Sequence, residues 1–134
     1  MHKIIPVSEN EKKLWPTSII VDLPKPFSDE RGTIQPLLDI DMKSSVLITS
    51  KSGSIRANHY HKTDWHYCYV LSGKIKYYHR PHGNKDLPKE VTIKEKQMFF
   101  TPPMVDHAMV FIKKTEFITW SRNSRIQEVY EADV

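Results

Sequence analysis

The stretch GSIRANHYHKTDWHYCYVLSG, residues 53–73, decides the fold, because it sets histidines between two glycines on two consecutive predicted β-strands. His59 and His61 are two residues apart, so on an extended strand their rings leave from the same face. Imidazole nitrogens that converge from one face are ligands for a borderline cation. If the fold joins the strands, the sequence predicts one divalent transition metal (Zn, Ni or Fe) bound by His59, His61, His66 and His107.

The length and composition of the chain limit its class. A chain of 134 residues can bury one hydrophobic core, so we expect a single domain over residues 1–134. Its one cysteine, Cys68, excludes a disulfide framework and fits a reducing compartment. The first residues carry charges throughout, and no stretch is long and apolar enough for a signal peptide or a membrane span. We therefore expect a cytoplasmic protein with no membrane partner.

The net charge of +4 and the pI of about 9.1 raise the possibility of nucleic-acid binding. The basic residues are scattered through predicted turns and strands, and no arginine-rich helix or nucleic-acid motif gathers them. We therefore expect no nucleic-acid partner. A mild positive field does favour an anionic small molecule such as a nucleotide diphosphate.

Short segments rich in β-branched and aromatic residues alternate with turn signals such as Ser72-Gly73 and Pro102-Pro103. This pattern predicts an all-β sandwich or barrel rather than a parallel sheet with crossover helices. A capping-box pattern at 8–11 predicts one helical turn near the N-terminus. The expected strands are Ser18–Leu23, Thr33–Leu38, Ser45–Thr49, Ser54–His61, Trp65–Leu71, Lys74–Arg80, Glu90–Ile93, Met98–Thr101, His107–Ile112 and Glu116–Ser121.

The spacing of the glycines and histidines in 53–73 resembles the first motif of the cupin superfamily, with His66 where most cupins have glutamate. The segment from Lys96 to His107 is similar to the second cupin motif, although Lys96 and Met104 replace its glycines. The two motifs span 53–111. This resemblance implies a small antiparallel double-stranded β-helix, a jelly-roll-like barrel that holds the metal inside. It also implies a homodimer.

A narrower resemblance lies in the segments 26–37, 54–62 and 101–125. They are similar to the nucleotide-sugar cupins: the dTDP-4-dehydrorhamnose 3,5-epimerases, the 3,4-ketoisomerases and the cupin domain of capsular polysaccharide enzymes. The resemblance implies that Arg31 and Arg56 contact the diphosphate of the substrate and that His59 is the general base. Lys62, in the same run as His59, is a further candidate for binding the substrate.

The acid tyrosine of the epimerases has no counterpart, because matching the segments places Trp120 at its position. A metal acting as a Lewis acid would stabilise the enolate instead. A histidine bound to a metal cannot also be the free base. In that case the candidates for the base are Tyr67, Tyr69, Asp64 or a metal-bound water.

The sequence thus predicts a metal-binding cupin that acts on a nucleotide-linked 4-keto-deoxysugar, as an epimerase or isomerase in the synthesis of surface polysaccharide precursors. Proton abstraction next to the ketone is the expected chemistry. Two alternatives stay open. One is an oxygenase-type cupin that uses iron or nickel, and the other is a non-catalytic cupin that binds a metal or a sugar.

Overall fold

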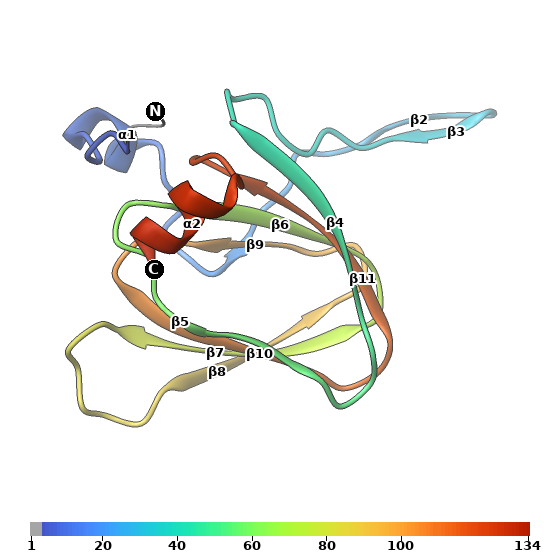
Figure 1. The fold of residues 1–134 in the computed structure, drawn as a ribbon. Helices are drawn as coiled ribbons and strands as arrows, with labels where there is room; N and C mark the ends of the chain where they lie inside the picture. The colour runs from blue at the N-terminus through green and yellow to red at the C-terminus, as the bar shows by residue number, and fades with distance from the viewer. Residues whose placement is uncertain (1–3) are drawn as a thin grey trace.

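The computed structural model describes residues 4–134, apart from the side chain of Glu131. Two antiparallel sheets face each other and form the barrel (Figure 1). One has the order β1 (Ile20–Val21), β9 (Met98–Thr101), β6 (His66–Ser72), β11 (Thr115–Ser121) and β4 (Ser44–Ser50). The other has the order β5 (Ile55–His59), β10 (Val105–Phe111), β7 (Lys74–Pro81) and β8 (Lys89–Lys94). The predicted all-β class is therefore confirmed.

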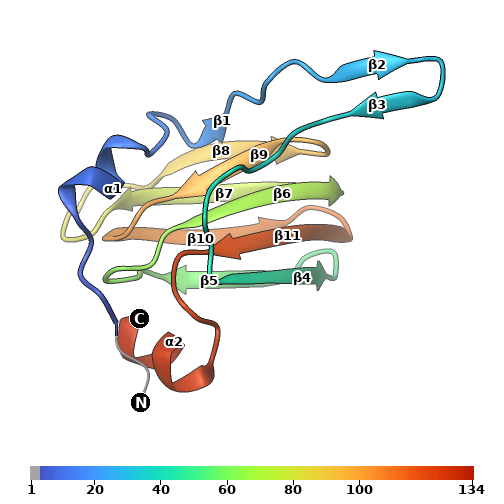
Figure 2. The same cartoon turned by 90° about the horizontal axis from the view of Figure 1, so that it is seen from above.

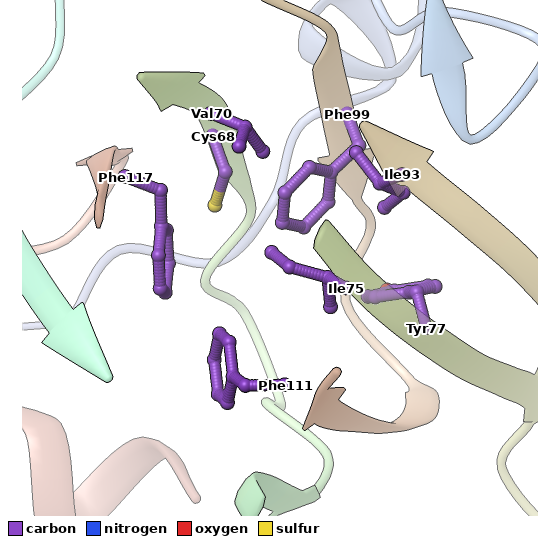
Figure 3. Close-up of a cluster of buried hydrophobic side chains, with 8 residues drawn as sticks. All are labelled: Cys68, Val70, Ile75, Tyr77, Ile93, Phe99, Phe111 and Phe117. Carbon is purple, nitrogen blue, oxygen red and sulfur yellow. The ribbon is translucent and has the colours of Figure 1, made fainter. Parts of the chain in front are cut away.

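The main core lies between the sheets, as Figure 3 shows. It forms because successive side chains of a strand point to opposite faces. On β6, Cys68 and Val70 point into the barrel, and on β11 Phe117 does. The rings of Phe111 and Phe117 stack at 5.7 Å between centroids. The full set is Cys68, Val70, Ile75, Tyr77, Ile93, Phe99, Phe111 and Phe117.

A second apolar cluster covers the outer face of the five-stranded sheet. Its buried members are Trp65, Tyr67, Met98 and Phe100, and residues of the N-terminal segment such as Trp15 pack against them. The predicted helical turn is present as α1 (Glu9–Lys13), with both hydrogen bonds of its capping box formed. The N-terminal segment thus shields a sheet face that would otherwise be exposed.

The hairpin of β2 (Phe27–Asp29) and β3 (Gly32–Ile34) projects away from the barrel (Figures 1 and 2). The strand expected over Thr33–Leu38 ends at Ile34, so its predicted extent is wrong. Pairing stops there because Pro36 offers no N–H to a neighbouring strand. The strand expected over Ser18–Leu23 is likewise reduced to β1.

The strand expected over Ser54–His61 ends at His59, which corrects the assumption that His61 lies on the same strand. Ala57 and Asn58 have positive φ angles of 64° and 60°, and the pairing with β10 shifts register between His107 and Ala108. These kinks turn the chain into the loop that carries His61.

The helix α2 (Gln127–Asp133) was not expected from the sequence. It packs beside the loop that follows β5, as the hydrogen bond from Lys62 N to Asp133 O (2.7 Å) shows. Within residues 4–134, neither helix has the length and apolar character needed to cross a membrane.

Candidate functional site: a histidine chamber inside the barrel

A cavity of about 130 Å³ lies inside the barrel, at the end where β5 and β10 carry their histidines. We call it the chamber. Its wall combines the predicted histidines with positive charge and with α2. The lining residues that matter for function are His59, His61, His66, His107, Arg56 and Arg125, together with Tyr130.

The imidazoles of His59, His61 and His107 form one cluster. The Nε2 atoms of His59 and His61 are 3.1 Å apart. The ring centroid of His107 lies 5.0 Å from that of His59 and 5.6 Å from that of His61. One ligand nitrogen from each of the three lies within 4.8 Å of the others. The fold therefore brings together residues 48 positions apart in the sequence (107 − 59 = 48).

A backbone hydrogen bond fixes the proton of His107. Its Nδ1 lies 3.0 Å from the carbonyl oxygen of Val105. A carbonyl can only accept, so Nδ1 carries the hydrogen and Nε2 keeps its lone pair. A second-sphere bond of this kind is typical of metal-binding histidines.

All three imidazoles of this cluster are neutral near pH 7. The pKa of His61 is lowered to about 2, first by burial and then by the charges of the neighbouring histidines and Arg125. Burial lowers the pKa of His107 to about 4, although the bond to Val105 acts in the opposite direction. The pKa of His59 is also lowered, first by burial. A neutral imidazole is the form that binds a metal or accepts a proton.

His66 is tied to a different partner. Its Nε2 lies 2.7 Å from Asp64 Oδ2, and both side chains are buried. Its ring centroid stands 4.8 Å from that of His61, so the fourth predicted histidine does line the chamber. Asp64 Oδ1 accepts the backbone N–H of Asn123 at 2.9 Å. Asp64 therefore orients His66 and the local backbone, and together with His61 and His66 it forms a second group of ligand atoms within 4.8 Å of one another.

Two side chains that sequence reasoning missed stand on the chamber wall. Tyr130 of α2 packs its ring 6.3 Å from that of His59 and 5.7 Å from that of His61. The guanidinium of Arg125 lies 4.7 Å above the Tyr130 ring. No local pattern marks either residue, because only the path of the chain after β11, through Arg125 into α2, brings them to the histidines.

Arg56, the candidate for binding the diphosphate, lines the chamber. Its Nε donates to Ser50 Oγ at 2.7 Å and its Nη2 to the carbonyl of Thr49 at 3.0 Å. These bonds hold the guanidinium against β4, with donor capacity left for a ligand, since guanidinium has five N–H groups.

Several predicted site residues lie outside the chamber. Tyr67 and Tyr69 point to the outer face of β6, where they join the second apolar cluster. Trp120 belongs to the same outer cluster, and it is Thr119 of β11 that lines the chamber. The matching that put Trp120 at the position of the catalytic acid is therefore corrected. Side chains alternate between the two faces of β11, so Thr119 points inward and Trp120 points outward.

The two predicted substrate-binding cations outside the chamber have local partners. Lys62 is exposed, and its Nζ lies 3.4 Å from the carbonyl of Ala132. Arg31 sits on the projecting hairpin, where it is paired with Asp29. Neither lines the chamber within this copy of the chain.

The residues present fit a divalent cation. Two nitrogens bound to zinc at about 2.0–2.1 Å stand roughly 3.3 Å apart in a tetrahedral site. The observed separation of 3.1 Å between the Nε2 atoms of His59 and His61 is close to that value. In the absence of a cation the same contact is an N–H···N hydrogen bond. Three neutral imidazoles suit Zn, Ni or Fe, and they leave positions open for a substrate.

A larger groove of about 420 Å³ adjoins the chamber, since His59 and His107 line both. Tyr60, Tyr78 and Arg80 also line the groove. His59 and His107 thus stand between the chamber and the groove.

No model of a known protein family matches the sequence, and no curated protein matches it. Solved structures do match. The sugar 3,4-ketoisomerase QdtA from Thermoanaerobacterium thermosaccharolyticum is 18% identical, with a TM-score of 0.64 over 78% of this chain and 80% of that one. The dTDP-4-dehydrorhamnose 3,5-epimerase from Sulfolobus tokodaii is 18% identical, with a TM-score of 0.63 over 79% and 70% of the two chains.

The capsular polysaccharide assembling protein CapF from Staphylococcus aureus is 22% identical, with a TM-score of 0.58 over 80% of this chain but 32% of that one. These are the kinds of cupin that the motifs resemble, so the likeness confirms the predicted barrel. At these identities it establishes the fold alone.

Proposed function

We propose that this cupin barrel is an epimerase or isomerase of nucleotide-linked 4-keto sugars, in the synthesis of surface polysaccharide precursors. One observation carries the proposal: a neutral, partly buried imidazole, His59, shares a chamber with the guanidinium of Arg56. Proteins of similar fold support the substrate class, because the ketoisomerase was solved with TDP-4-keto-6-deoxyglucose and an epimerase with dTDP-4-keto-L-rhamnose.

In this proposal His59 is the general base. Its lone pair takes the proton from the carbon beside the ketone, and the bonding electrons move into an enolate. Arg56 and Arg125 place positive charge on the wall, where they attract the enolate oxygen and the diphosphate. A proton delivered by water to the opposite face of this carbon gives the epimer, and His59 then releases its proton to the solvent. Return of the proton from His59 to the former ketone carbon, with transfer of the hydroxyl proton between the two oxygens of the enediol, gives the keto isomer.

The sizes of the two cavities indicate which part of the substrate each one binds. The chamber of about 130 Å³ suits a sugar ring, whereas pockets for drug-sized ligands measure about 300–1,000 Å³. The adjoining groove of about 420 Å³ shares His59 and offers Tyr60 and Arg80. In our proposal the nucleotide lies in the groove, with its base against an aromatic ring.

A metal-dependent form of the enzyme is the second candidate, favoured by the three convergent imidazoles. His59, His61 and His107 would hold the cation, which supplies Lewis-acid stabilisation of a ketone oxygen when bound. His59 then has no free lone pair on its ligand nitrogen and cannot be the base. His66, oriented by Asp64, becomes the imidazole on the wall that accepts the proton. His59 therefore distinguishes the two forms of the enzyme, because it is the base in the metal-free form and a metal ligand in the other.

We further propose a homodimer in which the projecting hairpin reaches a second copy. Phe27 is 59% exposed and Ile34 is 65% exposed, so the hairpin presents apolar surface that residues 4–134 leave uncovered. Its cation, Arg31, then belongs to the site of the neighbouring copy, where it would meet the diphosphate. This arrangement reconciles the predicted role of Arg31 with its position here.

The test is incubation of the protein with dTDP- or UDP-4-keto-6-deoxyglucose in deuterated water, with mass spectrometry of the recovered sugar. We expect deuterium at the carbon beside the ketone, and its loss in His59→Asn. His79→Asn is the matched control, because His79 lines neither the chamber nor the groove. Chelation of metals from the protein separates the two forms, since it abolishes exchange only in the metal-dependent one. No deuterium uptake from either donor would refute the proposal.

A further inference from the structure

One residue of α2 holds the loop that carries His61. The backbone N–H groups of Lys62, Thr63 and Asp64 all donate to Asp133. The first bonds its carbonyl oxygen at 2.7 Å, the second its Oδ1 at 2.9 Å and the third its Oδ2 at 2.8 Å. A buried backbone N–H without a hydrogen-bond partner costs free energy, so a loop that enters the interior needs acceptors for these groups. Here a single residue about 70 positions away satisfies them.

The same carboxylate faces His61. Asp133 and His61 are each 2% exposed, and Asp133 Oδ2 lies 3.9 Å from His61 Nδ1. That Nδ1 is buried and has no hydrogen-bond partner among residues 4–134. The carboxylate has room for one more donor: it offers about four acceptor sites, and the Thr63 N–H, the Thr63 hydroxyl and the Asp64 N–H take three. The remaining site is on Oδ2.

The proton of His61 follows from this arrangement. A neutral imidazole carries one N–H and one lone pair. A carboxylate beside Nδ1 favours the hydrogen on Nδ1, which leaves the lone pair on Nε2. Nε2 is the atom that lies 3.1 Å from His59 Nε2, inside the histidine cluster. Tyr130, on the same helix as Asp133, packs against both rings and limits their rotation.

We infer that Asp133 is a positioning residue of the histidine site: it holds the loop after β5 and keeps His61 in the Nδ1–H form, with Nε2 directed at His59 and His107. The helix α2, which carries Asp133, thus contributes to the geometry of the histidine site. The inference concerns the geometry of the histidines, so it stands or falls independently of the proposed sugar substrate.

The first test is the proton position of His61 in the unaltered protein. Two-bond ¹H–¹⁵N correlation spectra of the histidine rings distinguish a protonated nitrogen from one with a free lone pair. We expect the His61 signals to show a protonated Nδ1 and an unprotonated Nε2. The opposite form, or an equal mixture of both, would overturn the inference even if no variant folds.

The second test compares Asp133→Asn with Glu128→Gln, which removes one negative charge from an exposed position of α2. An amide at 133 places a donor where the His61 proton or the Asp64 N–H points. We expect Asp133→Asn to lose the Nδ1–H form and to bind Zn²⁺ about 10- to 100-fold more weakly, as for other second-sphere carboxylates. Glu128→Gln should match the unaltered protein. A folded Asp133→Asn protein with an unchanged His61 spectrum would refute the role.

Discussion

Glu11 should link the N-terminal segment to the barrel through its charge. Its Oε1 accepts from Trp65 Nε1 at 3.1 Å and from Arg122 Nε at 2.6 Å, while Oε2 accepts from Ser8 N at 2.8 Å. Burial alone would raise its pKa, but the bonds from Arg122, Ser8 and Trp65 outweigh burial and lower the pKa from 4.5 to about 2. These bonds connect the segment that covers the outer cluster to Arg122, which follows β11, and to Trp65, which precedes β6.

The magnitude follows from this pKa difference. A pKa lowered from 4.5 to about 2 corresponds to about 3 kcal/mol, since one pKa unit is worth about 1.4 kcal/mol. The Glu11 side chain is 25% exposed, so solvent screening reduces the contribution to about 2–3 kcal/mol. Because the folded pKa is the lower one, the stabilisation is complete above about pH 4.5 and is lost as the pH falls towards 2.

The assay is urea unfolding of the unaltered protein and Glu11→Gln at several pH values. We expect the variant to lose about 2–3 kcal/mol at pH 7 and progressively less below pH 4.5. Glu9→Gln is the matched control, since Glu9 is 84% exposed and pairs with Lys12 at 3.1 Å. It should change stability by less than about 0.5 kcal/mol. A loss from Glu11→Gln that is the same at pH 7 and near pH 2 would refute the reasoning.

Three further predictions concern the core. Gly73→Ala should cost on the order of 3 kcal/mol in urea unfolding, because Gly73 has φ 110° and an added Cβ would lie 2.6 Å from Thr115 Cα; a loss below about 1 kcal/mol would contradict this. Cys68 should resist a thiol reagent until the protein unfolds, since burial raises the pKa of its thiol to about 12, and rapid native labelling would show otherwise. Tyr77→Phe should cost about 1–2 kcal/mol, because the Tyr77 hydroxyl lies 2.7 Å from Thr101 Oγ1 in the core, and a second change of Thr101→Val should recover part of the loss in a double-mutant cycle.

Much of the fold could be predicted because its signals are local. Alternation of inward and outward side chains indicated β-strands, and the capping box at Ser8 indicated α1, which the structure contains. The spacing of Gly53, the histidines and Gly73 indicated a cupin barrel, and structures of similar fold confirm it. Where the prediction was wrong, as over Thr33–Leu38, the strand ended early at Ile34 because Pro36 has no backbone N–H to donate.

The functional site could be predicted only in part, because sequence signals are local. Residue type and spacing nominated the four histidines and Arg56, all of which line the chamber. They could not show that Tyr67 faces outward, since the inward phase of a strand is set by the sheet that it meets. They also could not show that His66 bonds Asp64 and forms, with Asp64 and His61, a second group of ligand atoms beside that of His59, His61 and His107.

The sequence by itself determined the all-β fold class and the histidine and arginine side chains that the site can use, because strand periodicity and motif spacing act over a few residues. Only the tertiary structure decided which nitrogens converge and what holds them. The contact between Asp133 and the loop of His61 joins positions about 70 residues apart, and no local pattern encodes a hydrogen bond across that separation. Folding alone brings α2 to the chamber, so the supporting shell of the site exists only in three dimensions.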